Sequence, residues 1–182
     1  MITADELWTL SYYRVSEIAG SLFFGRVART LGGHPLHGEL TKHYADEAQH
    51  AWLWTKCLRS VGHQPVKLDS AYQDQYGALI GTPANLMEVL AVTQVFEQRV
   101  IGQYARHLRR PGTAPAVRET LQTIMLDERW HLAWVREALE SMKPDYGETA
   151  IRKTLDRYRE ADRAVFESTM TDAAERFGHS AD

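Results

Sequence analysis

The 182-residue sequence has a single cysteine, Cys57, and this scarcity excludes several kinds of protein. One cysteine cannot form a disulfide within the chain, and no cysteine pair is available for a rubredoxin-type iron centre or a structural zinc site. The opening segment, MITADELWTLSYYR, carries acidic residues and lacks the basic start of a signal peptide. We therefore expect a protein of the reducing cytoplasm.

Long apolar runs and a charge excess of one sign are also missing. No stretch reaches the ~18 uninterrupted apolar residues that a transmembrane helix needs. The formal net charge is −3, and the nearest approach to a basic run is Arg106, His107, Arg109 and Arg110. That group is typical of a helix C-terminus that complements the helix dipole. We expect neither a membrane nor a nucleic acid as a partner.

Glycine and proline are few and fall mainly in five short breaks, at residues 31–35, 61–65, 81–83, 111–113 and 143–145. The segments between the breaks carry apolar residues at steps of three and four, which is the helical period. They predict helices over residues 4–31, 36–61, 83–109, 114–142 and 147–177. Pro83 is expected in the first turn of the third of these helices, because proline is tolerated there.

The lengths of the connections predict how the helices are arranged. The connection over residues 62–82 is longer than a bundle turn needs, and Lys67 to Gly77 is expected to hold a short helix. Short, long and short connections fit two antiparallel helical hairpins joined by one crossover. We predict an all-α fold in a single domain over residues 1–182: a four-helix bundle over about 4–142 and an amphipathic accessory helix over about 147–177.

A glutamate interrupts the apolar stripe near the middle of each of the first four predicted helices. These residues are Glu17, Glu47, Glu97 and Glu128. Burying an unpaired carboxylate costs several kcal/mol, so four of them, one in each helix, need a shared explanation.

Two of the glutamates are followed three residues later by a histidine, His50 and His131, which lies on the same helix face. The distance from Glu17 to Glu47 is 47 − 17 = 30 residues, and the distance from Glu97 to Glu128 is 128 − 97 = 31. Each half of the chain is thus a glutamate followed by an ExxH pair. Two such halves gather four carboxylates and two imidazoles, which predicts a two-metal site whose cations offset the buried anions.

An aspartate precedes the glutamate of both motifs, as Asp46 in DEAQH and Asp127 in DERWH. A histidine that binds a metal through one nitrogen needs a partner for the other N–H group. We predict that Asp46 and Asp127 fill this role around the metal ligands, Asp46 for His131 and Asp127 for His50.

The order E…ExxH…E…ExxH, from about residue 10 to 140, resembles the ferritin-like di-iron carboxylate superfamily. The resemblance implies that Glu47 and Glu128 bridge the metals and that Glu17 and Glu97 are terminal ligands. It places His50 on the metal of Glu17 and His131 on the metal of Glu97. The oxygen and nitrogen ligands suit two iron ions, or manganese and iron, better than zinc.

Within that superfamily, the DExxH form resembles the hydroxylase components of bacterial monooxygenases. It favours a di-iron oxidoreductase, an oxygenase or oxidase that uses O2, an external electron donor and a small organic substrate. Gln49 and Trp130 stand where those proteins often have arginine. A rubrerythrin-like peroxidase is disfavoured because cysteine pairs are missing and Gln94 and Val100, the neighbours of Glu97, are not carboxylates.

Other interpretations stay open at this stage. They are a ferroxidase or iron-storage protein, a non-catalytic helical module with a structural metal site, and a homodimer formed through the fifth helix. His43, four residues before Glu47, either points toward the site or is a core or partly exposed histidine.

Most aromatic residues of the predicted interior are expected to be packing residues: Tyr13, Phe23, Phe24, Tyr44, Trp54, Phe96, Tyr104, Trp130 and Trp134. Five further histidines near breaks and termini are expected to face solvent: His34, His37, His63, His107 and His179.

Overall fold

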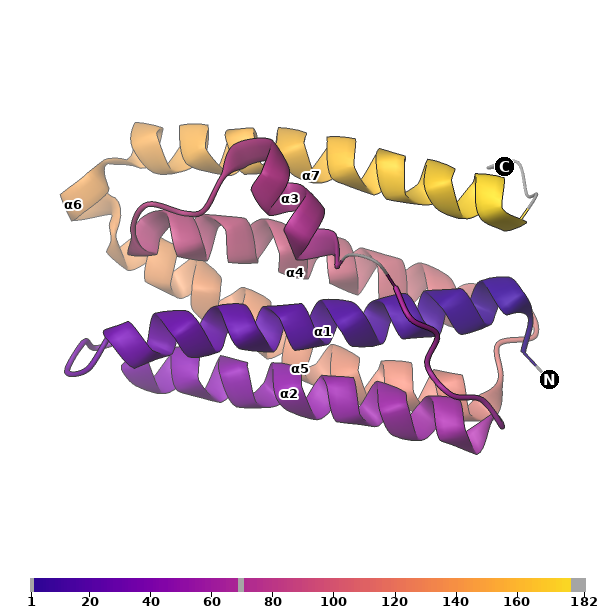
Figure 1. Cartoon of the computed structure of the whole chain (residues 1–182). Helices are drawn as coiled ribbons and strands as arrows, with labels where there is room; N and C mark the ends of the chain where they lie inside the picture. Colours follow the sequence, from indigo (N-terminus) through magenta and orange to yellow (C-terminus); the bar gives the residue numbers. More distant parts are fainter. Residues whose placement is uncertain (1, 69–70, 178–182) are drawn as a thin grey trace. The chain divides into compact units, whose positions relative to one another are not determined.

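The computed structural model describes residues 2–68 and 71–177, and this part of the chain is all-helical, in agreement with a helical bundle. It contains seven helices and no strand within those ranges (Figure 1). The helices are α1 (Ala4–Thr30), α2 (His37–Ser60), α3 (Tyr72–Ile80), α4 (Leu86–Arg109), α5 (Pro115–Ser141), α6 (Lys143–Tyr146) and α7 (Glu148–Phe177). The five long helices agree with the predicted segments to within a few residues.

Side-chain caps set the beginnings of two helices. The Thr3 hydroxyl accepts a hydrogen bond from the Glu6 amide at 3.1 Å, and the Asn85 side chain accepts one from the Glu88 amide at 3.0 Å. Each satisfies an amide that has no partner within its own helix. The prediction for Pro83 is therefore wrong: α4 begins at Leu86, after the Asn85 cap, and Pro83 lies before the helix.

The chain divides into two compact units. Unit 1 comprises Met1–Asp74 and Pro111–Ile124, and unit 2 comprises Gln75–Arg110 and Met125–Asp182. The prediction of a single domain stays a prediction.

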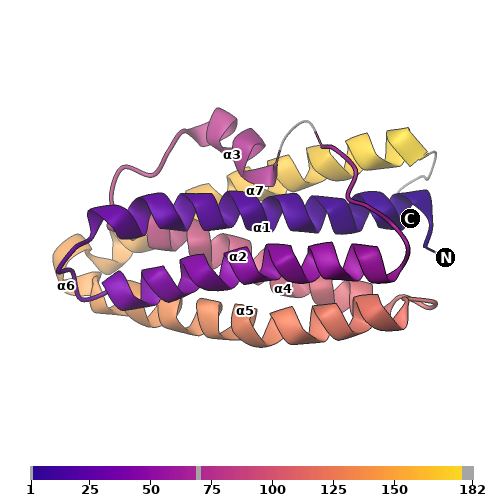
Figure 2. The same cartoon turned by 60° about the horizontal axis from the view of Figure 1, so that its bottom comes forward.

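In unit 1, α1 and α2 lie side by side as an antiparallel hairpin (Figures 1 and 2). Their core residues Leu10, Leu40 and Leu58 are fully buried. The segment that follows α2 returns to α1: the Val66 amide donates to the Ser11 hydroxyl at 3.1 Å, and the Gln73 side chain donates to the Ser16 carbonyl at 3.0 Å. These two hydrogen bonds hold the first part of the predicted long connection, which spans residues 62–82, against α1.

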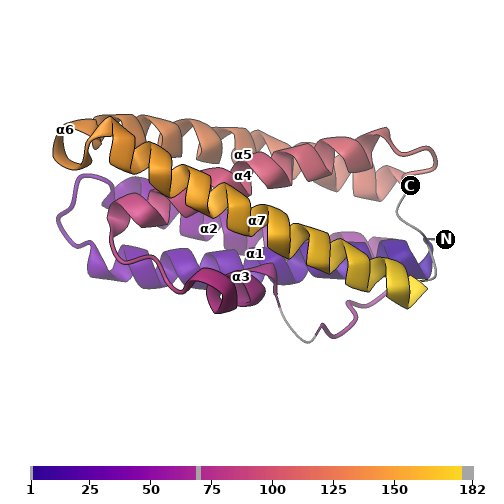
Figure 3. The same cartoon turned by 90° about the horizontal axis from the view of Figure 1, so that it is seen from above.

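In unit 2, α7 runs along α4 in the same direction (Figure 3). Polar contacts join the two helices at two levels. Arg157 pairs with Glu88, near the start of α4, at 3.1 Å, and further along both helices Arg99 pairs with Asp162 at 3.0 Å. The Tyr76 hydroxyl also donates to the Tyr158 carbonyl at 2.8 Å, which ties α3 to α7. The predicted fifth long helix, α7, thus packs on α4 through contacts that include two ion pairs.

Glu88 gives unit 2 a pH-dependent contact. A hydrogen bond from the Ala84 amide, helped by Arg157 and the Tyr158 hydroxyl, holds the pKa of this carboxyl below its ordinary value. A lowered folded-state pKa contributes stability above the unfolded-state pKa, and this stability is lost as the pH falls through the folded-state pKa. We expect Glu88→Gln to be less stable than the wild type at neutral pH, and the gap to close in acid. Urea unfolding across that range measures it; a gap independent of pH would contradict the prediction.

Two short helices differ from the sequence prediction. The short helix expected within Lys67–Gly77 is α3, which begins later, at Tyr72, and continues to Ile80. The break expected at residues 143–145 is itself a single helical turn, α6, which ends at Gly147 with a φ of 79°. A positive φ suits glycine because it lacks a Cβ, so Gly147 lets the chain turn directly from α6 into α7.

Candidate metal centre

Unit 1 brings three of the six predicted ligands together. Glu17 of α1 and Glu47 and His50 of α2 are 5%, 7% and 0% exposed. Each offers a ligand atom within 4.8 Å of those of the other two, a spacing at which a metal ion fits between them. The His50 Nδ1 atom lies 3.8 Å from Glu17 Oε2, so the imidazole of α2 faces the carboxylate of α1.

Trp54 supports the Glu17 carboxylate from the next turn of α2. Its side chain is fully buried, and its indole N–H donates to Glu17 Oε1 at 3.4 Å. The Trp54 ring in turn packs against Tyr13 of α1, with ring centroids 5.2 Å apart. Because a bulky, buried indole has few alternative positions, its N–H group holds the Glu17 carboxylate in one orientation. The hydrogen bond also offsets part of the free energy that burying this carboxylate costs.

Glu47 has its own close surroundings. One of its oxygens, Oε1, lies 3.4 Å from Nε2 of His43, one turn earlier on α2. The other, Oε2, lies against Gly20 of α1, so close that a Cβ on Gly20 would collide with it. Glycine at position 20 is therefore what allows the Glu47 carboxylate to approach the α1 backbone.

Unit 2 places the other three predicted ligands together. Glu97 of α4 and Glu128 and His131 of α5 are 5%, 1% and 0% exposed. His131 Nδ1 lies 3.1 Å from Glu128 Oε2, within hydrogen-bonding distance, and 3.9 Å from Glu97 Oε1. The Trp130 ring meets the His131 ring edge-on at a centroid distance of 5.6 Å.

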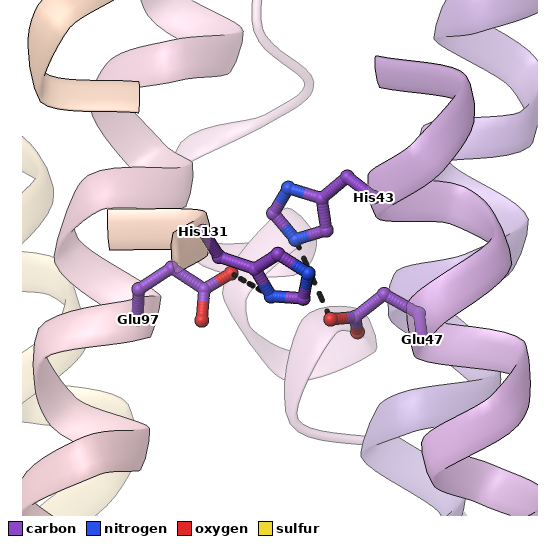
Figure 4. Close-up of side chains that lie close together, drawn as sticks. All are labelled: His43, Glu47, Glu97 and His131. Atoms are coloured by element: carbon purple, nitrogen blue, oxygen red, sulfur yellow. Dashed lines mark ion pairs between the residues drawn. The ribbon is translucent and has the colours of Figure 1, made fainter. Parts of the chain in front are cut away.

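The two units thus contain the same local arrangement. In each, the Nδ1 atom of the ExxH histidine faces the glutamate of the other helix, at 3.8 Å in unit 1 and 3.9 Å in unit 2. Figure 4 draws one ion pair from each unit, His43 with Glu47 and His131 with Glu97. Carboxylate oxygens and imidazole nitrogens suit iron or manganese, and a divalent cation would offset the buried negative charge.

The two aspartates of the DExxH motifs are less buried than the ligands that follow them. Asp46 is partly exposed and pairs with Lys42, one turn earlier on the outer side of α2. Asp127 is also intermediate in exposure. Their predicted contacts with His131 and His50 stay predictions.

Sequence analysis leaves the orientation of His43 open and assigns no role to Gly20. For His43 the available signal is spacing, since it lies four residues before Glu47. Gly20 lies three residues after Glu17 on the same stripe, but spacing alone does not show what approaches it. Two other expectations were wrong: Tyr44 is 42% exposed instead of interior, and His107 is 3% exposed instead of solvent-facing. His179 lies outside the described residues.

Cys57 lies in the core of unit 1 and is 3% exposed. Burial raises the pKa of its thiol, while a hydrogen bond with Thr120 acts in the opposite direction. Because the thiolate is the reactive form, we expect the native protein to react with a thiol reagent such as DTNB at least about tenfold more slowly than the urea-unfolded chain. Equal rates would show that the thiol is accessible in the native state.

Comparisons with known proteins add no family to these findings. No protein-family model, no curated protein and no solved structure matches the chain. Among the described helices, none has an apolar stretch long enough to cross a membrane. What supports a metal centre is therefore the set of buried donors within each unit.

Proposed function

We propose that Glu17, Glu47, His50, Glu97, Glu128 and His131 together hold two iron ions in a ferritin-like four-helix bundle. One observation carries the proposal: the same buried arrangement, a glutamate facing an ExxH histidine, occurs in both units at nearly the same distance. A single buried pair of this kind is compatible with an ordinary ion pair. Its repetition, with spacings of 30 and 31 residues, supports a two-metal site, because di-iron carboxylate bundles supply a glutamate and a Glu-x-x-His motif from each pair of helices.

The electrostatic balance also supports metal ions at these residues. The six side chains include four carboxylates, each at most 7% exposed, and two imidazoles. Two protonated histidines would leave an excess of buried negative charge, and each uncompensated carboxylate costs several kcal/mol. Two divalent cations neutralise the four carboxylates while both histidines stay neutral, the form in which they bind metal.

We propose further that the protein is an oxidoreductase, an oxygenase or oxidase of a small organic substrate. Bound iron would supply O2 activation, with electrons from an external donor. The residues of the chain hold and shield the centre: Trp54 orients Glu17, Gly20 admits Glu47, and the Phe24 and Tyr13 rings exclude water beside His43 and Trp54. The missing cysteine pairs and the DExxH motifs support this reaction class over peroxide reduction.

Anaerobic loading with Fe(II), followed by oxygen, tests the proposal. We expect two iron ions per chain, and O2 uptake that continues only while a reductant is supplied. Uptake that instead ends in a ferric mineral within a large assembly would replace the oxidase proposal by iron storage. Uptake of peroxide in preference to O2 would replace it by a peroxidase. A chain that takes up neither iron nor manganese would refute the metal centre itself.

A further inference from the structure

His43 is a fully buried histidine that the six-ligand set leaves out. It is 0% exposed, and its Nε2 atom lies 3.4 Å from Oε1 of Glu47. Its ring stacks on Phe24 of α1, with centroids 3.9 Å apart and planes 28° from parallel. The stack fixes the plane of the imidazole, and the position of His43 one turn before Glu47 aims its nitrogen at that carboxylate.

The donors of α2 form one continuous stripe. His43, Glu47 and His50 follow at steps of four and three, and each is at most 7% exposed. Each of them has an oxygen or nitrogen atom close to another ionisable group of unit 1. Simple packing would be served better by an apolar residue, because burying an imidazole costs free energy that a leucine does not.

The other half of the chain shows what packing alone selects at this position. The residue four places before Glu128 is Ile124, which is fully buried and has no ligand atom. Residues 43 and 124 thus occupy equivalent places relative to their ExxH motifs, yet one is a histidine and the other aliphatic. The difference adds a nitrogen donor to the α2 half only.

We propose that His43 is a further metal ligand, which binds through Nε2 an ion that Glu47 binds through Oε1. This rests on the proposed function, since it presumes that Glu47 binds metal. The centre then has three imidazoles, two from α2 and one from α5, and its two metal positions are chemically unequal. Added nitrogen favours iron over manganese, because imidazole suits iron while manganese prefers oxygen ligands.

Titration with Co(II), a spectroscopic substitute for Fe(II), tests the proposal on the whole chain. We expect two Co(II) ions to bind to the wild type, and one of the two binding steps to weaken by more than about 100-fold in His43→Gln, beyond the 10- to 100-fold loss typical of a group that only orients a ligand. Mn(II) binding should weaken less than Co(II) binding. His107→Gln, which alters another buried histidine of the chain, is the matched control and should leave both steps unchanged.

A second measurement uses the wild type alone and so does not depend on how the variant folds. Proton NMR of the Co(II)-loaded protein should show three strongly shifted, exchangeable imidazole N–H signals. Two such signals, or unchanged Co(II) affinity in His43→Gln, would overturn the assignment of His43 and leave the six-ligand centre intact. Failure of the wild type to bind Co(II) would instead refute the proposed function, and the role of His43 with it.

Discussion

Replacing Glu47 or Glu128 by alanine will remove metal binding while leaving a folded protein. Each is a candidate bridging ligand and is at most 7% exposed. Without metal, each substitution removes one of several buried carboxylates and with it the free-energy cost of burying that charge, so the metal-free variants are expected to remain folded. With metal, the wild type should gain about 2.7 kcal/mol at a free concentration 100 times the dissociation constant, and the variants should gain none.

Thermal unfolding of both variants, with and without Fe(II) or Co(II), measures these two effects separately. The matched control is Glu137→Ala, which removes an exposed glutamate from the same helix, α5, nine residues after Glu128. It should keep the full metal-dependent shift in Tm. Full metal content in Glu47→Ala and Glu128→Ala would show that the ligand assignments are wrong. Variants that were much less stable than the wild type in the absence of metal would indicate that these glutamates belong to ordinary ion pairs.

The positions of the helices and of the six proposed ligands were readable from the sequence because they depend on local, repeated features. Apolar periodicity and breaks at glycine and proline located the five long helices. A glutamate within an apolar stripe is easy to recognise in a sequence. The spacing from such a glutamate to the next ExxH motif is 30 residues in one half of the chain and 31 in the other, and this repetition favours a shared site over unrelated ion pairs. Within each unit these glutamates and histidines are buried and lie close to one another, and their role as metal ligands stays a prediction.

The wrong predictions for Tyr44 and His107 share a physical origin: the inward-facing stripe of a helix can continue by a step of either three or four residues. From Leu40 the inward stripe continues either to His43 or to Tyr44, and hydrophobicity favoured Tyr44. The structure buries His43 fully and leaves Tyr44 42% exposed. The same choice recurs after Tyr104, where His107 is buried and Leu108 is only half-buried. The sequence predicts a solvent-facing side chain at His107 and leaves the orientation of His43 open, so burial overturns the first prediction and decides the second.

The role of Gly20 could not be read from the sequence, because it depends on which atom of α2 reaches α1. Periodicity placed Gly20 on the inward stripe, three residues after Glu17. Only the fold shows that the Glu47 carboxylate lies against it. A helical glycine costs up to about 1 kcal/mol relative to alanine, so its presence in the middle of α1 is explained by that close approach.

We therefore expect Gly20→Ala to be the most damaging single-methyl addition to the centre. The new Cβ would collide with Glu47 Oε2, and Glu47 cannot simply swing away, because its other oxygen faces His43 and both residues are buried. Displacing this ligand should weaken metal binding about 10- to 100-fold, the range seen when groups that orient ligands are changed. Co(II) titration followed by urea unfolding of the metal-free protein measures both consequences.

Gly102→Ala on α4 is the matched control for Gly20→Ala. A Cβ there would have Arg106 Nη1 as its nearest neighbour at 3.5 Å, an ordinary contact with the end of a flexible side chain. It should leave metal binding unchanged and stabilise the chain by up to about 1 kcal/mol, because alanine is the better helix former. In Gly20→Ala the same gain in helix propensity is opposed by overpacking, which typically costs about 1–3 kcal/mol. If Gly20→Ala bound two Co(II) ions with wild-type affinity, the Glu47 carboxylate would not need its place against α1, and its role as a bridging ligand would lose this support.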